Sequence, residues 1–535
     1  MLSYRKLAMR VLGHPLHTGG IDSPRPASQR AAAFILTAAM LTTLAAPAFA
    51  DIWHIENGDI TISAGESGNN VTQNNNTTYG DTNTIITNQN KDTASSHTVT
   101  IEAKDKDDKV EVTLKDVNID TSSRNKAAVS VTGEGDTNIK LDGDNALKSD
   151  IYRSGIYGSG SLTISGGEND SLTAQGGSGA NGISSSGSLT ISGGTVTANG
   201  DDGGRGISSS GSVTISGGST VTANGGSGTI SGGDGIWSGG GVTISGGSTV
   251  TANGGNGGSL VGGDGIRSGG GLTVSDGTVT AKGGNGDSKD GYGGDGIRSG
   301  GVVTISGNTV NAAGGYGGKV GGYGICSFDR VAISGGTVEA AGGNGSTGGG
   351  SGIYSSVIDL SGSLELTAKA GSPNGKALSQ KGSELVLDTI KDKLGPGAKV
   401  TATDADGKVI DQVSTPRPVE PEESSSSSDG GSAAPSAPAS PLPGLTVTDK
   451  DGQRISYTST QSGNTLTVCV GRLTASFRIS LAALRQLRAE GIETITFQTI
   501  LCSTTLSVDE LLAMGGEDAE AVLTHRFTDS SLTVG

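Results

Sequence analysis

The nine residues GGDGIWSGG at 232–240 return almost unchanged as GGDGIRSGG at 262–270 and again at 293–301. The starts of these copies are 30 and 31 residues apart. Repeats of about 20 to 50 residues are typical of solenoids, in which each repeat packs mainly against its neighbours. The repetition therefore predicts a stack of similar coils.

The Gly-Ile step inside these copies extends the repeat in both directions. It recurs every 24 to 31 residues, with isoleucine at Ile156, Ile183, Ile207, Ile236, Ile266, Ile297, Ile325 and Ile353. Apolar and polar residues alternate after each step, as in LTIS at 189–192 and TVTA at 195–198. This period of two predicts short strands with one buried face, and the Gly-Gly and Ser-Gly pairs between them predict turns.

Three short strands in each repeat predict an all-β domain, a right-handed parallel β-helix with a core of Ile, Val and Leu. The same alternation at 110–120, 127–133 and 137–143 extends the helix toward the N-terminus. Repeat length varies mainly between the third strand and the next Gly-Ile step, so insertions are expected at one corner of each coil. The high glycine content, 94 of 535 residues, lacks the three-residue period of collagen.

Composition divides the rest of the chain. An apolar run at 31–46 followed by Ala48-Phe49-Ala50 predicts an export signal, and hence a secreted or cell-surface protein without a transmembrane segment in its mature part. Seven prolines between 416 and 443 predict an extended linker. The predicted organisation is a signal with a long basic region at 1–50, a cap and first coils at 51–150, the glycine-rich β-helix at 151–415, the Pro/Ser linker at 416–443 and a small α+β domain at 444–535.

Charge and cysteine content restrict the partners. Five of the 37 basic residues and one of the 53 acidic residues precede residue 51, leaving 52 acidic against 32 basic residues, a formal charge of −20. Such an acidic chain disfavours nucleic acid as a partner and suits cations or glycans. Three cysteines are too few for a disulfide framework. Cys469 and Cys502 are expected either to pair or to be two small core residues.

Aspartate recurs at one position of the repeat. Asp234, Asp264 and Asp295 each lie two residues before the isoleucine, so stacking should place them in a column. Carboxylates about 5 Å apart repel unless a cation or arginine intervenes. We weigh two hypotheses: turn aspartates neutralised by Arg267 and Arg298, and a ladder that binds Ca²⁺ through carboxylate oxygens.

The residue after the isoleucine should face solvent. Aromatic or arginine side chains occupy this position at Tyr157, Trp237, Arg267, Arg298 and Tyr354. Aromatic faces and guanidinium groups suit contact with sugars, so these residues are candidates for a glycan-binding strip. Exposed aromatic residues without a binding role are the alternative.

The segments at 110–120, 127–133 and 137–143 and the following coils, which contain GI, SLTISGG and TVTA, resemble a known group of proteins. Over roughly 98–370 the chain is similar to secreted right-handed β-helix proteins of Gram-positive bacteria described as carbohydrate-binding-domain proteins, relatives of the pectate-lyase superfamily. The resemblance implies binding of plant-type or host polysaccharide, sometimes with Ca²⁺, without cleavage. No catalytic residue is carried over from it.

We therefore expect a secreted, adhesin-like polysaccharide-binding β-helix protein without catalysis. Near-identical coils show no single constellation of acid, base and stabiliser, and the repeats contain no histidine. One alternative is a pectate-type lyase acting through Asp264, Asp295 and Arg267 or Arg298. Another is a structural stalk that presents residues 444–535.

Overall fold

The computed structural model describes residues 51–416 and, beyond them, 445–448, 454–455, 457–462, 464–470, 475–499, 503–514, 519–525 and 530–534. The predicted signal at 1–50 and the predicted linker at 416–443, apart from its first residue, lie outside the described residues. Contacts divide the chain into two units, with the boundary between Pro421 and Glu422. No helix among the described residues is long and apolar enough to cross a membrane.

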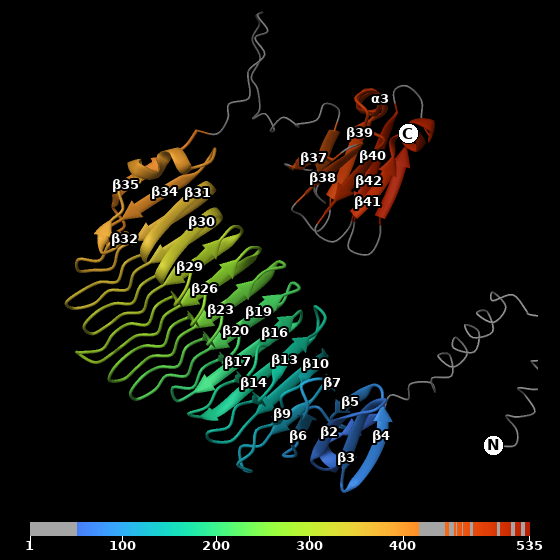
Figure 1. Cartoon of the computed structure of the whole chain (residues 1–535), viewed down its shortest axis with the longest axis vertical. Coiled ribbons are helices and arrows are strands. Elements are labelled where there is room, and N and C mark those ends of the chain that lie inside the picture. Colours follow the sequence, from blue (N-terminus) through green and yellow to red (C-terminus); the bar gives the residue numbers. More distant parts are fainter. Residues whose placement is uncertain are drawn as a thin grey trace, which may run out of the picture. The chain divides into compact units, whose positions relative to one another are not determined.

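The first unit is a parallel β-helix, which confirms the predicted fold class (Figure 1). Its first column of strands contains the Gly-Ile segments, paired coil on coil in parallel. The column consists of β2 (Ile60–Gly65), β6 (Val99–Ala103), β9 (Val129–Gly133), β12 (Ile156–Gly158), β15 (Ile183–Ser185), β18 (Ile207–Ser209), β21 (Ile236–Ser238), β24 (Ile266–Ser268), β27 (Ile297–Ser299), β30 (Ile325–Ala341), β31 (Ile353–Lys369) and β32 (Leu378–Gln380).

The second column contains the LTIS-type segments and the third the TVTA-type segments, and β30 and β31 pass through all three columns. The second column is built from β1 (Ile52–His54), β5 (Thr84–Thr87), β7 (Lys109–Lys115), β10 (Asp136–Asp142), β13 (Ser161–Ser165), β16 (Leu189–Ser192), β19 (Val213–Ser216), β22 (Val242–Ile244), β25 (Leu272–Val274) and β28 (Val303–Ile305). The third is built from β8 (Asn118–Asp120), β11 (Asp144–Lys148), β14 (Ser171–Ser178), β17 (Thr195–Asp201), β20 (Thr220–Asn224), β23 (Ser248–Asn253), β26 (Gly277–Lys282), β29 (Thr309–Ala313) and β34 (Lys399–Thr403).

Stacked columns of like residues form the core. Ile183, Ile207 and Ile236 are fully buried and lie in register on successive coils. Val196 and Val221 do the same in the third column. Burying such a side chain stabilises the fold by about 1.5 to 3 kcal/mol. Each coil thus contributes a similar apolar layer, which explains why a repeated sequence folds into a rod.

Glycine accounts for the corner between the third strand and the next Gly-Ile step. The chain there runs out and back, and glycines of the two limbs hydrogen-bond to each other at N–O distances of 2.7 to 3.0 Å. We call this set the glycine zipper, and it consists of Gly204, Gly226, Gly233, Gly255, Gly263, Gly284, Gly294, Gly315, Gly322, Gly343, Gly350 and Gly371.

The zipper leaves no space for side chains. From Gly233 onward, a Cβ atom on any of these glycines would lie 1.8 to 2.1 Å from a carbonyl oxygen of the preceding coil. The corner expected to hold variable insertions is therefore a regular ladder of bare backbone. Its tips also pair, through Ser231, Val261, Tyr292 and Val320 on successive coils.

Antiparallel strands close both ends of the β-helix. At the start, β2 pairs with β3 (Gly68–Gln73), which pairs with β4 (Asn76–Asp81), next to the short η1 (Ile55–Asn57). At the end, β32 pairs with β33 (Ser383–Glu384), and η2 (Leu387–Lys393) precedes β34, which pairs with β35 (Val409–Ser414). Such caps protect the open edges of a stack of strands.

The described residues of the second unit form two four-stranded sheets and two helices, in agreement with the predicted α+β class. One sheet has the order β36 (Leu445–Thr448), β39 (Ala475–Ser480), β42 (Glu520–His525) and β43 (Ser530–Val534). The other has the order β37 (Thr458–Ser462), β38 (Thr465–Cys469), β40 (Thr494–Gln498) and β41 (Ser503–Ser507). The helices are α3 (Leu481–Ala489) and α4 (Val508–Met514).

Phe477 and Phe497 lie at the centre of the second unit, with ring centroids 4.9 Å apart. The Cys469 thiol is free and lies 3.5 Å from Gln498 Oε1. Cys502, its predicted partner, lies outside the described residues.

Candidate functional site

The residue after each Gly-Ile step, and after the matching valine in the first coils, belongs to one row along the first column. In register order the row reads Thr100, Ser130, Tyr157, Ser184, Ser208, Trp237, Arg267, Arg298, Cys326 and Tyr354. Trp237, Arg267 and Arg298 are thus neighbours on three successive coils. Tyr157 is separated from them by two serines, and Tyr354 by Cys326.

The three predicted aspartates also form a column, and they are buried. Asp234 and Asp264 have 6% of their surface exposed and Asp295 has 3%. Asp234 Oδ1 accepts a hydrogen bond of 2.9 Å from the backbone N–H of Asp264, and Asp264 Oδ1 accepts one of 2.7 Å from that of Asp295. Asp295 Oδ1 accepts the N–H of Tyr323 at 2.7 Å. We call Asp234, Asp264 and Asp295 the aspartate column.

The same hydrogen bond occurs two coils earlier without a charge. Asn181 is in register with the column, and its Oδ1 accepts the backbone N–H of Arg205 at 2.8 Å. A neutral amide therefore performs the same structural role. The charge of the aspartates is not needed to satisfy the backbone.

Arginines compensate the two ends of the aspartate column. Arg205 Nε lies 3.2 Å from Asp234 Oδ2, and Arg298 Nη1 lies 3.3 Å from Asp295 Oδ2. Of the two arginines expected to neutralise the column, Arg298 forms an ion pair with Asp295, and Arg267 acts on Asp295 only through its charge, which opposes the rise in the pKa of that carboxyl. Among the described residues, no carboxylate lies within ion-pair distance of the Arg267 guanidinium. Arg205 forms the second ion pair, with Asp234 at the other end of the column.

Burial and mutual repulsion perturb the acids. The pKa of Asp264 lies well above its ordinary value because the carboxyl is buried and lies between Asp295 and Asp234. Burial raises the pKa of Asp295 to about 6, although the Tyr323 N–H and the charge of Arg298 act in the opposite direction. A buried carboxyl loses its charge more readily than an exposed one. Asp264, at the centre of the column, is therefore a weaker source of negative charge than an exposed aspartate.

A hollow of about 560 Å³ lies beside the aspartate column, and we call it the arginine groove. Arg205, Arg267 and Arg298 line it together with Asp234 and Asp264. Glycine-zipper backbone and Val261 also belong to its lining. The predicted Asp and Arg candidates thus meet in one groove.

Aromatic rings hold two of these arginines in place. The Arg205 guanidinium lies 4.4 Å from the centre of the Trp237 ring, and that of Arg298 lies 5.3 Å from the Phe328 ring. Both distances are in the range of cation–π contacts. The predicted strip residue Trp237 therefore supports Arg205 and is not itself part of the groove lining.

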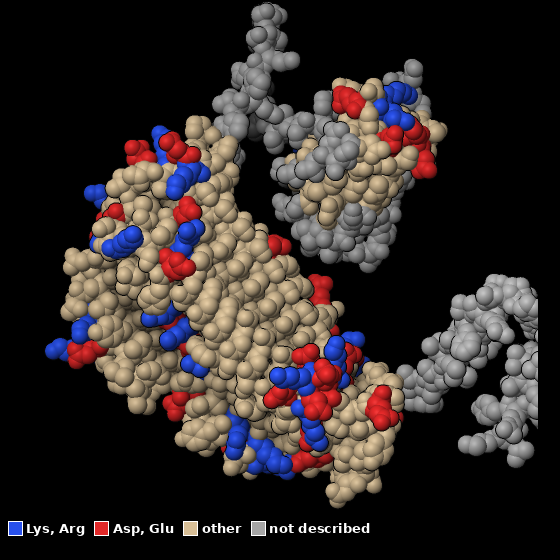
Figure 2. Space-filling model, viewed as in Figure 1, with Lys and Arg blue, Asp and Glu red and all other residues tan. Residues whose placement is uncertain are grey.

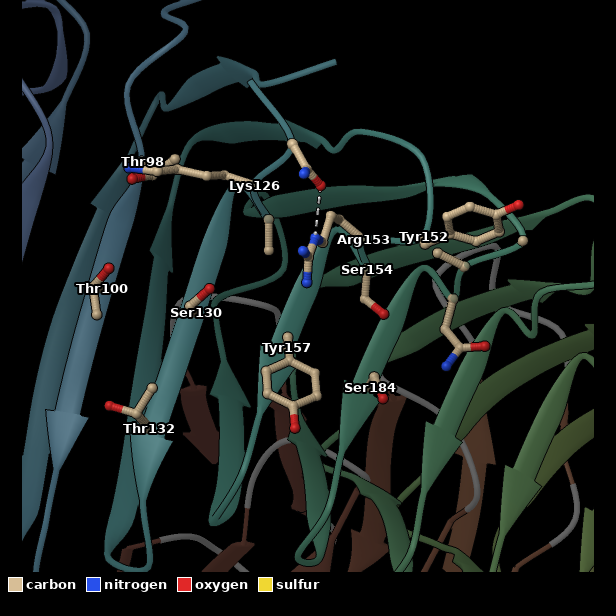
Figure 3. Close-up of a pocket in the computed structure, with 15 residues that line it drawn as sticks. Thr98, Thr100, Lys126, Ser130, Thr132, Tyr152, Arg153, Ser154, Tyr157 and Ser184 are labelled. Carbon is tan, nitrogen blue, oxygen red and sulfur yellow. Dashed lines mark hydrogen bonds between the residues drawn. The ribbon is translucent and has the colours of Figure 1, made fainter. Parts of the chain in front are cut away.

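A second hollow, of about 760 Å³, lies toward the N-terminus, and we call it the tyrosine groove (Figure 3). The ring of Tyr157 on β12 stands between Ser130 on β9 and Ser184 on β15. Arg153 and Tyr152 lie above it in the view, and Arg153 Nε donates to Asn125 Oδ1 at 3.3 Å. Hydroxyl, amide and cationic groups thus surround one half-exposed aromatic face.

The two grooves adjoin, because Gly179 and Asn181 line both. Together they run from β6 to β27 beside the first column, a distance of about 34 Å at about 4.8 Å per coil. Tyr354 lines neither groove and stacks on Tyr323 at a centroid distance of 4.9 Å. The structure therefore joins Tyr157, Arg267 and Arg298 along one line and leaves Tyr354 beyond its end.

The aspartate column offers few free oxygens to a cation. Among the described residues, no group of three or more His, Cys, Asp or Glu side chains could hold a metal ion. Each Oδ1 accepts a backbone N–H, and the Oδ2 atoms of Asp234 and Asp295 contact arginines. Ca²⁺ prefers six to eight oxygen ligands. Calcium binding here stays a prediction, and the ligands would have to come largely from elsewhere.

Sequence reasoning missed Arg205, Asn181 and Tyr152. Arg205 lies two residues before Ile207, the position held by aspartate in later coils, so alignment on the Gly-Ile step contains the signal. Asn181 occupies the same position before Ile183. Tyr152 has no such signal in the repeat. It lines the groove together with Gly179 because their coils stack.

Comparisons with protein-family models, with curated proteins and with solved structures returned no match for this chain. The fold and the two grooves are therefore described from this chain's own residues.

Proposed function

We propose that this protein is a secreted, non-catalytic polysaccharide-binding protein whose ligand lies along the tyrosine and arginine grooves. The observation that carries the proposal is the continuity of the two hollows along the coil axis through Gly179 and Asn181. An extended polymer needs a long open groove rather than a closed pocket. The grouping with secreted carbohydrate-binding β-helix proteins is part of this proposal.

The chemistry of the tyrosine groove supports a sugar ligand. Hydroxyls of Thr98, Ser130 and Ser184 and the amide of Asn181 supply neutral donors and acceptors. Tyr157 has 44% of its surface exposed and presents an aromatic face beside them. Aromatic residues with one apolar body and one polar handle suit ligands that are partly apolar and rich in hydroxyls.

The experiment uses the full chain and a panel of soluble polysaccharides, with binding measured by calorimetry or affinity electrophoresis. We expect Tyr157→Ala to lower affinity for a bound glycan about tenfold, since loss of one aromatic contact costs about 1.4 kcal/mol. Tyr79→Ala is the matched control, because Tyr79 is an exposed tyrosine on β4 that lines neither groove. Equal effects of the two variants, or no binding by the panel, would contradict the proposal.

The same experiment tests the assistance by Ca²⁺ and the two alternative functions. Unsaturated uronate absorbance that disappears in Arg267→Ala or Arg298→Ala would favour the pectate-type lyase. Loss of binding in EDTA would favour assistance by Ca²⁺. A protein that binds no glycan, while residues 444–535 bind cells or another protein, would favour the stalk.

A further inference from the structure

The arginine groove presents cations at its surface and keeps its acids below. The side chains of Arg205 and Arg298 are 36% and 38% exposed, whereas those of Asp234 and Asp295 are 9% and 5% exposed. The carboxylate oxygens of Asp234 and Asp295 already accept hydrogen bonds from backbone N–H groups and contact these two arginines. A ligand in the groove would therefore meet guanidinium groups first.

Arg267 lies between the two held arginines and differs from both. In the outward row it is flanked by Trp237 on the preceding coil and Arg298 on the next. It is exposed, lines the groove, and has no ion pair or hydrogen bond with a side chain among the described residues. An unpaired guanidinium offers a planar fork of donors that matches carboxylate or sulfate oxygens.

We propose that Arg267, together with Arg205 and Arg298 in the same groove, forms an anion subsite that binds the acidic groups of a charged polysaccharide. The inference rests on the proposed function and names its ligand class, a glycan that carries carboxylates or sulfate esters. Arg205 and Arg298 act as preorganised neighbours, since ion pairs and aromatic rings already fix them. Arg267 is the residue free to pair with the ligand.

The arrangement of the arginines along the coil axis favours a polymeric ligand over a single small anion. Successive coils place the residues of the row about 4.8 Å apart, so the cations of the groove are distributed along the coil axis. An anionic chain lying in this direction would meet more than one of them. The contact is electrostatic, and its strength should fall with added salt even though the chain as a whole is acidic.

The test uses the full chain and two pairs of probes that differ only in charge. Polygalacturonate and its methyl ester form the carboxylate pair, and dextran sulfate and dextran form the sulfate pair. We expect Arg267→Ala to weaken binding of the charged member of at least one pair about tenfold at low salt, and to leave the neutral member unchanged. Arg267→Lys should retain part of the binding, because it keeps the charge and loses the fork.

Arg330→Ala is the matched control, since Arg330 is exposed on β30, forms no ion pair among the described residues and lines neither groove. A weaker interaction with charged and neutral members alike would overturn the anion subsite and leave glycan binding in place. Unchanged binding of the charged members in Arg267→Ala would do the same. Failure of every probe to bind the wild-type chain, alongside failure of the wider panel, would instead remove the proposed function itself.

Discussion

The nonapeptides at 262–270 and 293–301 are identical in sequence but differ in their contacts. In the second copy Arg298 pairs with Asp295 at 3.3 Å, whereas in the first Arg267 has no such partner. Asp295 is followed in the column by Tyr323, and Arg298 packs on Phe328 of the next coil. Asp264 instead lies between two other carboxylates. In a solenoid, the neighbouring coils decide what a repeated residue does.

Substitutions in the glycine zipper should destabilise the two nonapeptide copies equally. They should also have the largest effect on stability of all the variants proposed. Gly263→Ala and Gly294→Ala would each place a Cβ atom 1.9 to 2.0 Å from a carbonyl oxygen of the preceding coil. Overpacking against rigid backbone should lower the free energy of unfolding by about 3 kcal/mol. Chemical denaturation measures the loss. Gly348→Ala is the control, because its Cβ would meet only Val320 side-chain atoms at 3.8 Å.

Substitutions in the aspartate column should affect stability differently in the two nonapeptide copies. Asp264→Asn keeps an acceptor for the Asp295 N–H, as Asn181 does for Arg205, and removes a buried charge, so we expect unchanged or higher stability. Asp264→Ala leaves that N–H without its acceptor and should cost about 1 to 2 kcal/mol. Asp295→Asn also removes the partner of Arg298, so it should be less stable than Asp264→Asn. Equal thermal denaturation of the two Asn variants would contradict the contrast drawn between the copies.

Asp59, in the first coils, has a lowered pKa, in contrast to Asp264 and Asp295, and this difference can be tested by changing the pH. Asp59 contacts Arg124, Lys126 and His97, and it accepts the backbone N–H of Thr98. Hydrogen bonds from Arg124, Thr98 and Lys126 hold the pKa of Asp59 well below its ordinary value despite the opposing effect of partial burial. A depressed pKa stabilises the fold above the unfolded-state value of about 3.9, and this contribution is lost as pH falls toward the folded-state value.

Asp59→Asn should therefore lower the free energy of unfolding by about 1 kcal/mol at pH 7, a modest value because solvent screens a side chain that is one third exposed. The difference from wild type should shrink as pH falls below about 4. Denaturation at pH 7, 5 and 3 measures this trend. A difference that grows at low pH would contradict a lowered pKa of Asp59 in the folded state.

The smallest effect concerns the arginines themselves. Arg298→Lys loses the geometry of its pair with Asp295 and its contact with Phe328, so we expect a loss of about 0.5 kcal/mol. Arg267→Lys should leave stability unchanged, because Arg267 has no ion pair among the described residues. Thermal denaturation of the two variants side by side is the measurement. An equal loss in both would mean that Arg267 has a structural role.

Charged side chains are unevenly distributed over the β-helix (Figure 2). In this view they gather over the first and last coils and along the glycine-rich corner, whereas the surface over the middle strands of the third column is mostly uncharged. This pattern follows from the outward Thr residues of the third column, such as Thr195, Thr220 and Thr249, which are aligned by register.

Alternation and the Gly-Ile period predicted the strands, the coils and the in-register rows of Asp234, Asp264 and Asp295 and of Trp237, Arg267 and Arg298. They did so because stacking converts a repeat along the chain into a line in space. The interpretation of the long corner as variable insertions was incomplete. Its glycines lie there because two limbs approach backbone to backbone, and this approach involves residues of neighbouring coils.

The amino-acid sequence by itself determined the parallel β-helix, since a period of two with apolar residues at fixed offsets allows one efficient way of burying them. Only the tertiary structure decided which arginine pairs with which aspartate and that the two grooves adjoin at Gly179 and Asn181. The physical reason is that burial and the charges of adjacent coils set the electrostatics of each side chain. Identical nonapeptides experience different neighbours, so identical residues acquire different roles.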